Sequence, residues 1–245
     1  MPHLTWTDES RLSAGMTLRE DGDMRLRADD GVQDDVLRKR CAFLETQFSN
    51  ATIAAPLPVH GAAVATVTGN EPFHEKHALF SQTDALVTVV PGIALTVTAA
   101  DCLPVYFFDP VRGTIGLAHA GWRGLVAPPH GVLAATVEAL VVLGSKPMDI
   151  RVEVGPSIGP CHYVVDAARR KLFAARFGND VVCREALDLR RAAVRALVDL
   201  GLDAKQISAE PPCTVCQSDR FFSHRVDGRE PPGVGMAWIV LHRPG

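Results

Sequence analysis

Short apolar runs separated by tight turns occupy the middle of the chain and constrain its fold more than any other feature. Residues 84–90 have the pattern of a strand, Pro91-Gly92 that of a turn, and residues 93–98 that of the next strand. Residues 103–108 and 114–118 continue the series across a hairpin-type connection. Strands so closely spaced leave no room for the helical crossover of a βαβ unit. We therefore predict an α+β fold with mixed, largely antiparallel sheets.

Helical patterns flank this block, and further strand patterns lie outside it. Asp or Pro at the starts and Gly after the ends predict helices at residues 129–143, 166–177 and 188–200. Asp34 as N-cap and apolar residues on one face predict another at residues 34–45. Further strands are predicted at residues 24–28, 150–154 and 236–241, and residues 52–67 have the pattern of a strand, a loop and a second strand. No linker or low-complexity stretch divides the chain, so we expect residues 1–245 to form a single domain, with residues 1–33 as its least informative part.

Composition argues against nucleic-acid and membrane partners. The chain has 245 residues, a net charge of −3 and 47% hydrophobic residues, with no excess of basic residues. Its first residues lack the basic and apolar regions of a signal peptide. Residues 85–100 are too short and too interrupted to span a bilayer. We therefore expect a cytoplasmic protein whose six cysteines are thiols or ligands and do not form a disulfide framework.

Two soft, ionisable side chains stand at the ends of apolar runs, Cys102 after residues 93–98 and His119 after residues 114–118. A thiol and an imidazole brought together by buried strands indicate either a metal site or a nucleophile–base pair. His60 precedes a glycine that permits a tight turn, and it is the natural third ligand. Catalytic zinc keeps three protein ligands and one open position. Residue types alone leave both interpretations open.

Other residues are candidates for binding a substrate. Arg123 follows Trp122 in a turn flanked by glycines, where a guanidinium suits a phosphate or a ribose oxygen, and we expect the dipole of the helix predicted from Pro129 to assist it. Arg225, Phe222 and His162 are further candidates. The pair in Cys213-x-x-Cys216 has metal-binding spacing but no second pair in sequence, so we interpret both as loop thiols. His74 and His77 occupy a polar loop and are expected to be solvated.

Four blocks follow one another along the chain: His60-Gly61, Thr98–Val105, His119–Gly124 and Gly155–Cys161. In this order they resemble the signatures of the YfiH/laccase-domain family, also called the multicopper polyphenol oxidase family or the YfiH-type purine nucleoside phosphorylase family. The resemblance implies the YfiH-like fold, which is related to that of a bacterial deamidating toxin. It places the family's metal ligands on His60, Cys102 and His119, with Zn²⁺ as the metal and copper as the alternative.

Departures from the family pattern lie outside these ligands. Pro58-Val59 stand where a Gln usually precedes the first His, and no Gly-Gly-Val-Ser block occurs near the N-terminus. Lys39-Arg40 replaces a common Asn-Arg pair, and Val226 replaces an Arg in the block Phe221–Gly228. The metal-binding residues therefore match the family better than the substrate side does.

The resemblance implies a zinc-dependent enzyme of purine nucleosides. Its reactions would be phosphorolysis of adenosine, inosine, guanosine or methylthioadenosine, and deamination of adenosine. Cys102, His119 and Arg123 would be catalytic, and Arg123, Arg225, Phe222 and His162 would bind the nucleoside and phosphate. The alternatives are a metal-free Cys–His amide hydrolase, such as an enzyme that edits peptidoglycan precursors, a copper-dependent polyphenol oxidase, or a non-catalytic zinc-binding module. We expect a monomer or a homodimer.

Overall fold

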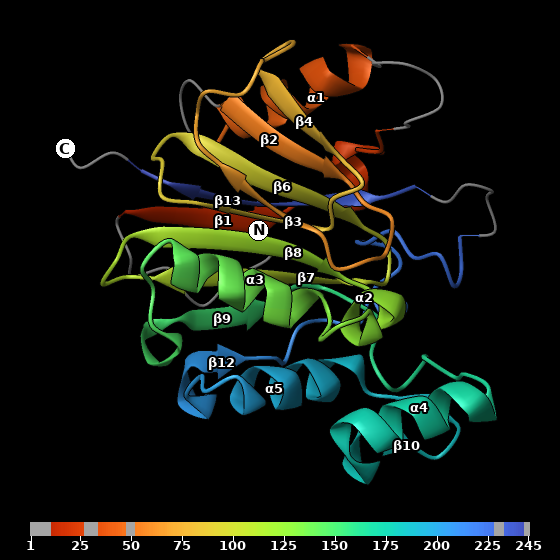
Figure 1. The fold of residues 1–245 in the computed structure, drawn as a ribbon. Helices are drawn as coiled ribbons and strands as arrows, with labels where there is room; N and C mark the ends of the chain where they lie inside the picture. Colours follow the sequence, from red (N-terminus) through yellow and green to blue (C-terminus); the bar gives the residue numbers. More distant parts are fainter. Residues whose placement is uncertain (1–10, 27–33, 48–51, 228–232, 243–245) are drawn as a thin grey trace.

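The computed structural model describes residues 11–26, 34–47, 52–227 and 233–242. Two mixed sheets lie between helices, with α1 (Asp34–Glu45) on one side and α3 (Val132–Val142) and α5 (Leu189–Asp199) on the other (Figure 1). The predicted α+β architecture with helices flanking mixed sheets is confirmed. None of the helices in the described part of the chain is both long enough and apolar enough to cross a bilayer.

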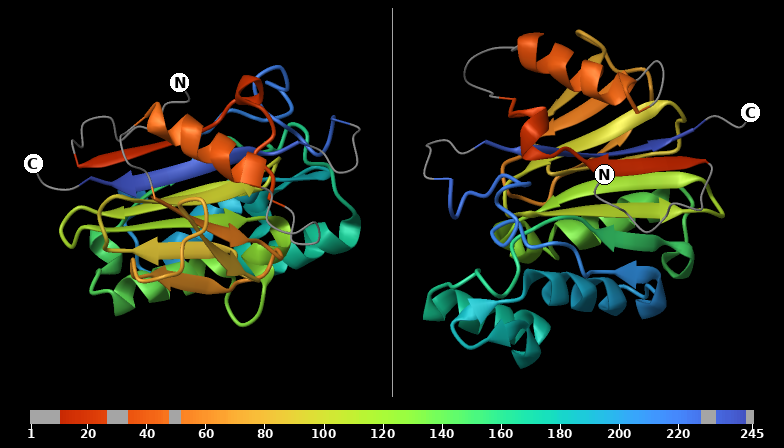
Figure 2. Two further views of the ribbon diagram at one scale, coloured as in Figure 1. Left: turned by 90° about the horizontal axis from the view of Figure 1, so that it is seen from above. Right: turned by 180° about the vertical axis from the view of Figure 1, so that it is seen from behind.

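The first sheet has five strands and joins the two ends of the described chain. Its order is β1 (Leu12–Met16), β13 (Gly235–Leu241), β6 (Ile93–Ala99), β2 (Thr52–Leu57) and β4 (His77–Ser81). The pairs β1–β13 and β13–β6 are antiparallel, whereas β2 runs parallel to both β6 and β4. Figure 2 shows the last strand between the first strand and β6, so the sheet forms only when distant segments meet.

The second sheet has six strands and carries three of the four strands of the predicted central block, whereas residues 93–98 form β6 of the first sheet. Its order is β12 (Ile207–Ser208), β9 (Arg151–Val154), β7 (Leu103–Asp109), β8 (Thr114–Ala120), β5 (Ala85–Thr88) and β3 (Val64–Val67). The pairs β9–β7, β7–β8 and β8–β5 are antiparallel. Each edge strand runs parallel to its neighbour, β12 to β9 and β3 to β5. A separate small ladder joins β10 (Val182–Cys183) to β11 (Ala186–Leu187).

Strand β7 shows how the sequence builds the layers. Alternate side chains of a strand point to opposite faces of its sheet. Val105 and Phe107 belong to the core that packs against α3, α4 (Ala167–Phe177) and α5. Tyr106 and Phe108 belong to the core between the two sheets. The apolar run 103–108 is therefore buried on both faces, which explains why it lacks the polar alternation of a half-exposed strand.

The remaining elements are short. Helix α2 (Trp122–Val126) follows β8, and single 3₁₀ turns occupy Arg19–Asp21, Pro147–Asp149, Asn179–Val181 and Ala204–Gln206. Helices α4 and α5 begin at the predicted N-caps, because the Asp166 carboxylate accepts from the Arg169 amide and the Asp188 carboxylate accepts from the Arg191 amide.

Several local predictions were wrong. Residues 22–26 form no strand, and Met24 is fully buried there; residues 27 and 28 lie outside the described ranges. The helix predicted from residue 129 begins at Val132, after Gly131 turns the chain with a φ of 92°. Val132 nevertheless packs beside Gly124, the residue that follows Arg123 in α2, since a Cβ at Gly124 would lie 3.4 Å from Val132 Cγ1. The expected assistance of the helix dipole to Arg123 stays a prediction. His77 is buried in β4, where tertiary pairing overrides the polar surroundings of the loop.

Candidate active site

The three residues predicted as metal ligands meet at one end of the second sheet. The ligand atoms of His60, Cys102 and His119 lie within 4.8 Å of one another. Cys102 stands between β6 and β7, and His119 lies near the end of β8. The antiparallel register pairs His119 with Pro104, two residues beyond Cys102. Strand pairing thus brings the thiol and this imidazole together, and the turn after β2 adds His60.

His119 is held in an orientation suited to a ligand. Its Nδ1–H donates to the carbonyl of Thr98 at 2.8 Å, which leaves the lone pair on Nε2. The side chain is buried, and Nε2 has no hydrogen-bond partner among the residues the structure describes. Burying a ring nitrogen costs free energy unless its lone pair accepts a hydrogen bond or binds a cation. A metal ion at this position would bind the lone pair of Nε2.

Asp84 fixes the turn that carries His60. Its Oδ1 accepts from the Val59 amide at 3.1 Å and its Oδ2 from the Gly61 amide at 2.9 Å, while its backbone carbonyl accepts from the His119 amide at 2.7 Å. These bonds hold His60 at a φ of 60°, a left-handed conformation that is unusual for a non-glycine residue. Asp84 is fully buried. Sequence reasoning missed it; the only signal was a carboxylate opening an apolar run.

Gly121 leaves room for the side chains of Cys102 and His60. A Cβ at this position would lie 2.7 Å from the Cys102 sulfur and 3.3 Å from His60 Cδ2. The rings of His60 and His119 meet edge to face with centroids 5.0 Å apart. Two imidazoles and one thiol form a donor set that suits Zn²⁺ and also copper. The residues present therefore fit the metal that the family resemblance implies.

Burial keeps the metal-free ligands uncharged. It raises the pKa of the Cys102 thiol to about 12, with Asp101 adding to the rise and Arg123 opposing it. It also lowers the pKa of His119 to about 4, helped by the neighbouring His60. A metal-free thiolate–imidazolium pair is therefore disfavoured at neutral pH, whereas a bound cation would stabilise the thiolate.

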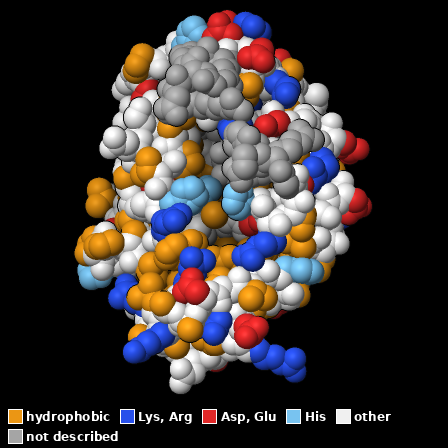
Figure 3. Space-filling model, turned by 90° about the vertical axis from the view of Figure 1, so that its right-hand side faces the viewer, with side chains coloured by type: hydrophobic (Ala, Val, Ile, Leu, Met, Phe, Trp, Pro, Cys, Tyr) orange, Lys and Arg blue, Asp and Glu red, His pale blue; other side chains and the backbone are white. Residues whose placement is uncertain are grey.

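Three arginine side chains near this centre make cation–π contacts with aromatic rings. Arg123 lies 4.8 Å and Arg169 4.1 Å from the centroid of the Trp122 ring, and Arg225 lies 5.6 Å from that of Tyr163. Figure 3 shows histidine and cationic side chains around a hollow on the face where α2 lies in Figure 1. Arg169 escaped sequence reasoning because nothing in the chain order links α4 to Trp122. These cations suit an anionic ligand.

Two other predicted substrate residues have different surroundings. Phe222 is buried, with the Arg19 guanidinium 4.6 Å from its ring centroid, and its contact with a substrate stays a prediction. His162 lies beside Cys161, Cys213 and Cys216, and the ligand atoms of these four residues are within 4.8 Å of one another. Cys213 and Cys216 are free cysteines in a loop, as predicted, but Cys161 and His162 from another loop lie beside them. The group could bind a metal.

Comparisons with known proteins agree with this arrangement. The chain is 34% identical to purine nucleoside phosphorylase YlmD of Bacillus subtilis over 173 residues, which are 66% of this chain and only 62% of that protein. It is 33% identical to adenosine deaminase RL5 of an unknown prokaryotic organism over 213 residues, 80% of this chain and 79% of that one. The crystal structure of the hypothetical protein YfiH of Bacillus licheniformis matches with a TM-score of 0.82 and 28% identity, covering 97% of this chain and 94% of that one.

A model of one protein family matches nearly the whole chain. The match runs over residues 20–242, and the family is described as multi-copper polyphenol oxidoreductase laccase. It includes the centre formed by His60, Cys102 and His119. The chain therefore belongs to the multi-copper polyphenol oxidoreductase laccase family, the YfiH-type family of purine nucleoside phosphorylases.

Proposed function

We propose that the chain is a zinc-dependent enzyme of purine nucleosides that catalyses phosphorolysis and the deamination of adenosine. The observation that carries the proposal is the buried Nε2 of His119, which has no hydrogen-bond partner in the described part of the chain and lies beside Cys102 and His60. Zinc held by these three residues would supply a Lewis acid and make a nucleophile available at neutral pH. The names of the relatives, a purine nucleoside phosphorylase and an adenosine deaminase, support the substrate class.

Two arginine side chains would bind and orient the phosphate. Arg123 and Arg225 would bind phosphate and orient it toward ribose C1′, because guanidinium groups bind phosphate oxygens with two parallel hydrogen bonds. Arg123 acts electrostatically on both His60 and Cys102, so an anion bound to it would lie close to the metal ligands. Trp122 and Tyr163 hold these guanidiniums through cation–π contacts.

The alternatives fit the site less well. A metal-free hydrolase needs Cys102 as a thiolate, which its burial opposes. Alkylation of Cys102 distinguishes the two: a free thiolate reacts rapidly with iodoacetamide whether or not a chelator is present, whereas Cys102 bound to zinc is protected, and its buried thiol stays slow to react after chelation. Polyphenol oxidation needs several coppers for O₂ reduction, and the trio could hold only a single ion.

The test follows the products made from adenosine by the zinc-loaded chain with and without phosphate, separated by chromatography. We expect adenine only when phosphate is present and inosine in either case. His119→Ala should abolish both products, while the exposed His74→Ala should leave both unchanged. Absence of both products from the metal-saturated wild type would overturn the proposal.

Arg123→Ala tests the phosphate site separately. Loss of a charged hydrogen bond worth about 1.5–3 kcal/mol should raise the KM for phosphate by roughly 10- to 100-fold and leave deamination much less affected. The matched control is Arg195→Ala, since Arg195 is a surface residue of α5 that contacts Asp180. An unchanged KM for phosphate in Arg123→Ala would exclude Arg123 from phosphate binding.

A further inference from the structure

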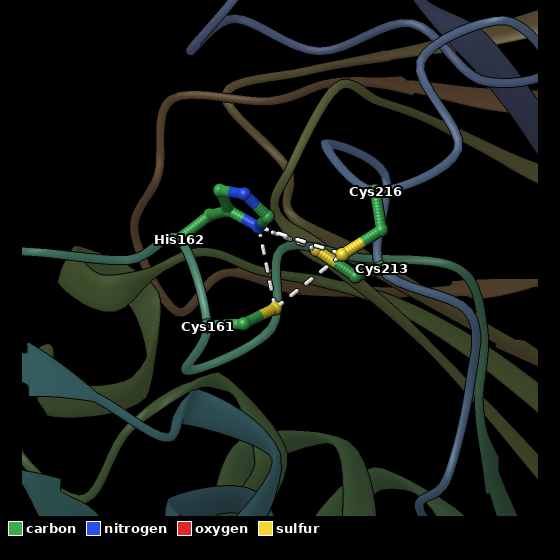
Figure 4. A group of neighbouring side chains, drawn as sticks. All are labelled: Cys161, His162, Cys213 and Cys216. Carbon is green, nitrogen blue, oxygen red and sulfur yellow. Dashed lines mark hydrogen bonds between the residues drawn. The ribbon is translucent and has the colours of Figure 1, made fainter.

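We propose that Cys161, His162, Cys213 and Cys216 form a second zinc site, a structural one that shares no ligand with the centre at His60. The four residues come from two loops. Cys161 and His162 lie in the loop between β9 and α4, and Cys213 and Cys216 lie in the segment between β12 and β13. Figure 4 shows the three sulfur atoms and Nδ1 of His162 gathered around a common point.

The distances match those of tetrahedral zinc. Nδ1 of His162 lies 3.3 Å from the Cys161 sulfur, 3.7 Å from that of Cys213 and 3.5 Å from that of Cys216. The sulfurs of Cys161 and Cys216 are 3.6 Å apart. Zinc–sulfur and zinc–nitrogen bonds of about 2.3 and 2.0 Å place two sulfurs about 3.8 Å apart, and a sulfur and a nitrogen about 3.5 Å apart.

Hydrogen bonding alone does not account for this cluster. A ring nitrogen offers either one N–H or one lone pair, so Nδ1 of His162 can serve only one of the three sulfurs that surround it. A cation at the centre would bind all four atoms at once. The amide of Gly159 donates to the Cys213 sulfur at 3.2 Å, a contact that favours the thiolate form required of a metal ligand.

The ligand set indicates a structural role. Three thiolates and one imidazole complete a tetrahedron and leave no open position for a substrate. Cys161 and Cys216 are exposed, so the ion can enter from solvent. Backbone contacts already join the same loops: Ser157 and Cys213 form a parallel bridge, and the Thr214 amide donates to the Ser157 carbonyl at 3.2 Å. Zinc would lock this junction.

The junction also braces the catalytic centre. Oγ1 of Thr214 donates to Oδ1 of Asp101 at 2.6 Å, and the Arg225 amide donates to Oδ2 at 2.9 Å. Asp101 has a φ of 84° and immediately precedes Cys102. Losing the second metal should therefore loosen the backbone that presents Cys102, although none of the four cluster residues belongs to the trio.

The first test counts zinc per chain by elemental analysis of full-length protein purified with zinc. The wild type should carry two ions, one for each cluster, and Cys216→Ser and Cys102→Ser should each carry one. Cys183→Ser is the matched control, because Cys183 lies outside both clusters, and it should keep two. One ion in the wild type, lost in Cys102→Ser and retained in Cys216→Ser, would overturn the second site and leave the proposed function intact.

A second measurement covers the case in which Cys216→Ser fails to fold. Cobalt(II) added to Cys102→Ser, whose trio has lost its thiolate, should give the intense thiolate-to-cobalt absorption of a tetrahedral sulfur-rich site, and excess zinc should remove it. Absence of that absorption, or a Cys161–Cys216 disulfide found by mass spectrometry in metal-saturated protein, would refute the proposal.

Discussion

At the scale of single residues, the candidate active site depends on groups that hold the ligands as much as on the ligands. His119 is oriented by the Thr98 carbonyl, and His60 is held by the carboxylate of Asp84. Such supporting contacts orient a ligand before the metal arrives and so increase its affinity. Asp84 contacts the backbone on both sides of His60 and also accepts from the amide of His119, so it links two of the three ligands.

Asp84→Asn should lower zinc affinity at the trio by about 10- to 100-fold. Asn replaces one of the two carboxylate oxygens by an amide donor, so one backbone N–H beside His60 loses its acceptor. Zinc competition titration against a coloured chelator measures the change. The control is Asp109→Asn, since Asp109 is equally buried but accepts from the Val111 and Arg112 amides through Oδ1 alone. Equal affinities of the two variants would contradict the role of Asp84.

At the scale of elements, α3 shows how burial divides one apolar helix. Its residues are nearly all hydrophobic, so no amphipathic pattern indicates which face meets the sheet. Leu133, Val137 and Leu140 pack into the core against the second sheet, whereas Val142 remains 85% exposed at the C-terminal end. The inward-facing residues therefore contribute most of the free energy of packing.

Leu140→Ala should reduce the free energy of unfolding by about 2–5 kcal/mol, through lost hydrophobic transfer energy and the cavity left behind. Val142→Ala, two residues along the same helix, should change it by no more than about 0.5 kcal/mol. Equilibrium unfolding in urea compares the two variants. Similar destabilisation by both would show that the inward face of α3 is wrongly assigned.

At the scale of the whole molecule, the two sheets are joined by packing and by a buried hydrogen bond. Tyr106 of β7 donates its hydroxyl proton to the Gly15 carbonyl of β1 at 2.8 Å. Gly15 lies in the first sheet and Tyr106 in the second, and Tyr106 is fully buried. This bond therefore couples the central hairpin to the N-terminal strand across the inter-sheet core.

Tyr106→Phe should destabilise the fold by about 1–2 kcal/mol, because it removes a buried hydrogen bond and leaves the Gly15 carbonyl without this donor. Hydrogen exchange should show faster exchange of amides in β1. Thr136→Val is the control, since it removes an equally buried hydroxyl that donates to the Val132 carbonyl within α3. Unchanged exchange in β1 of Tyr106→Phe would show that the bond does not couple the sheets.

The sequence by itself determined the strands of the central block and the α4 and α5 N-caps, because turn residues, apolar runs and capping side chains act locally. It also predicted that His60, Cys102 and His119 would meet, through blocks that resemble a known family, and the structure brings the three together. What it left open, the parallel pairing of β2 and the burial of His77 for example, depends on segments far apart in the chain.

Only the tertiary structure decided which of the remaining polar residues work together. Cys213 and Cys216 have a common spacing, and the meaning of that spacing depends on Cys161 and His162, which another loop brings beside them. Asp84 likewise gains its role from the turn at His60, and Arg169 from its contact with Trp122. Local sequence specifies elements, whereas a site assembled from several loops is defined by the packing that brings those loops together.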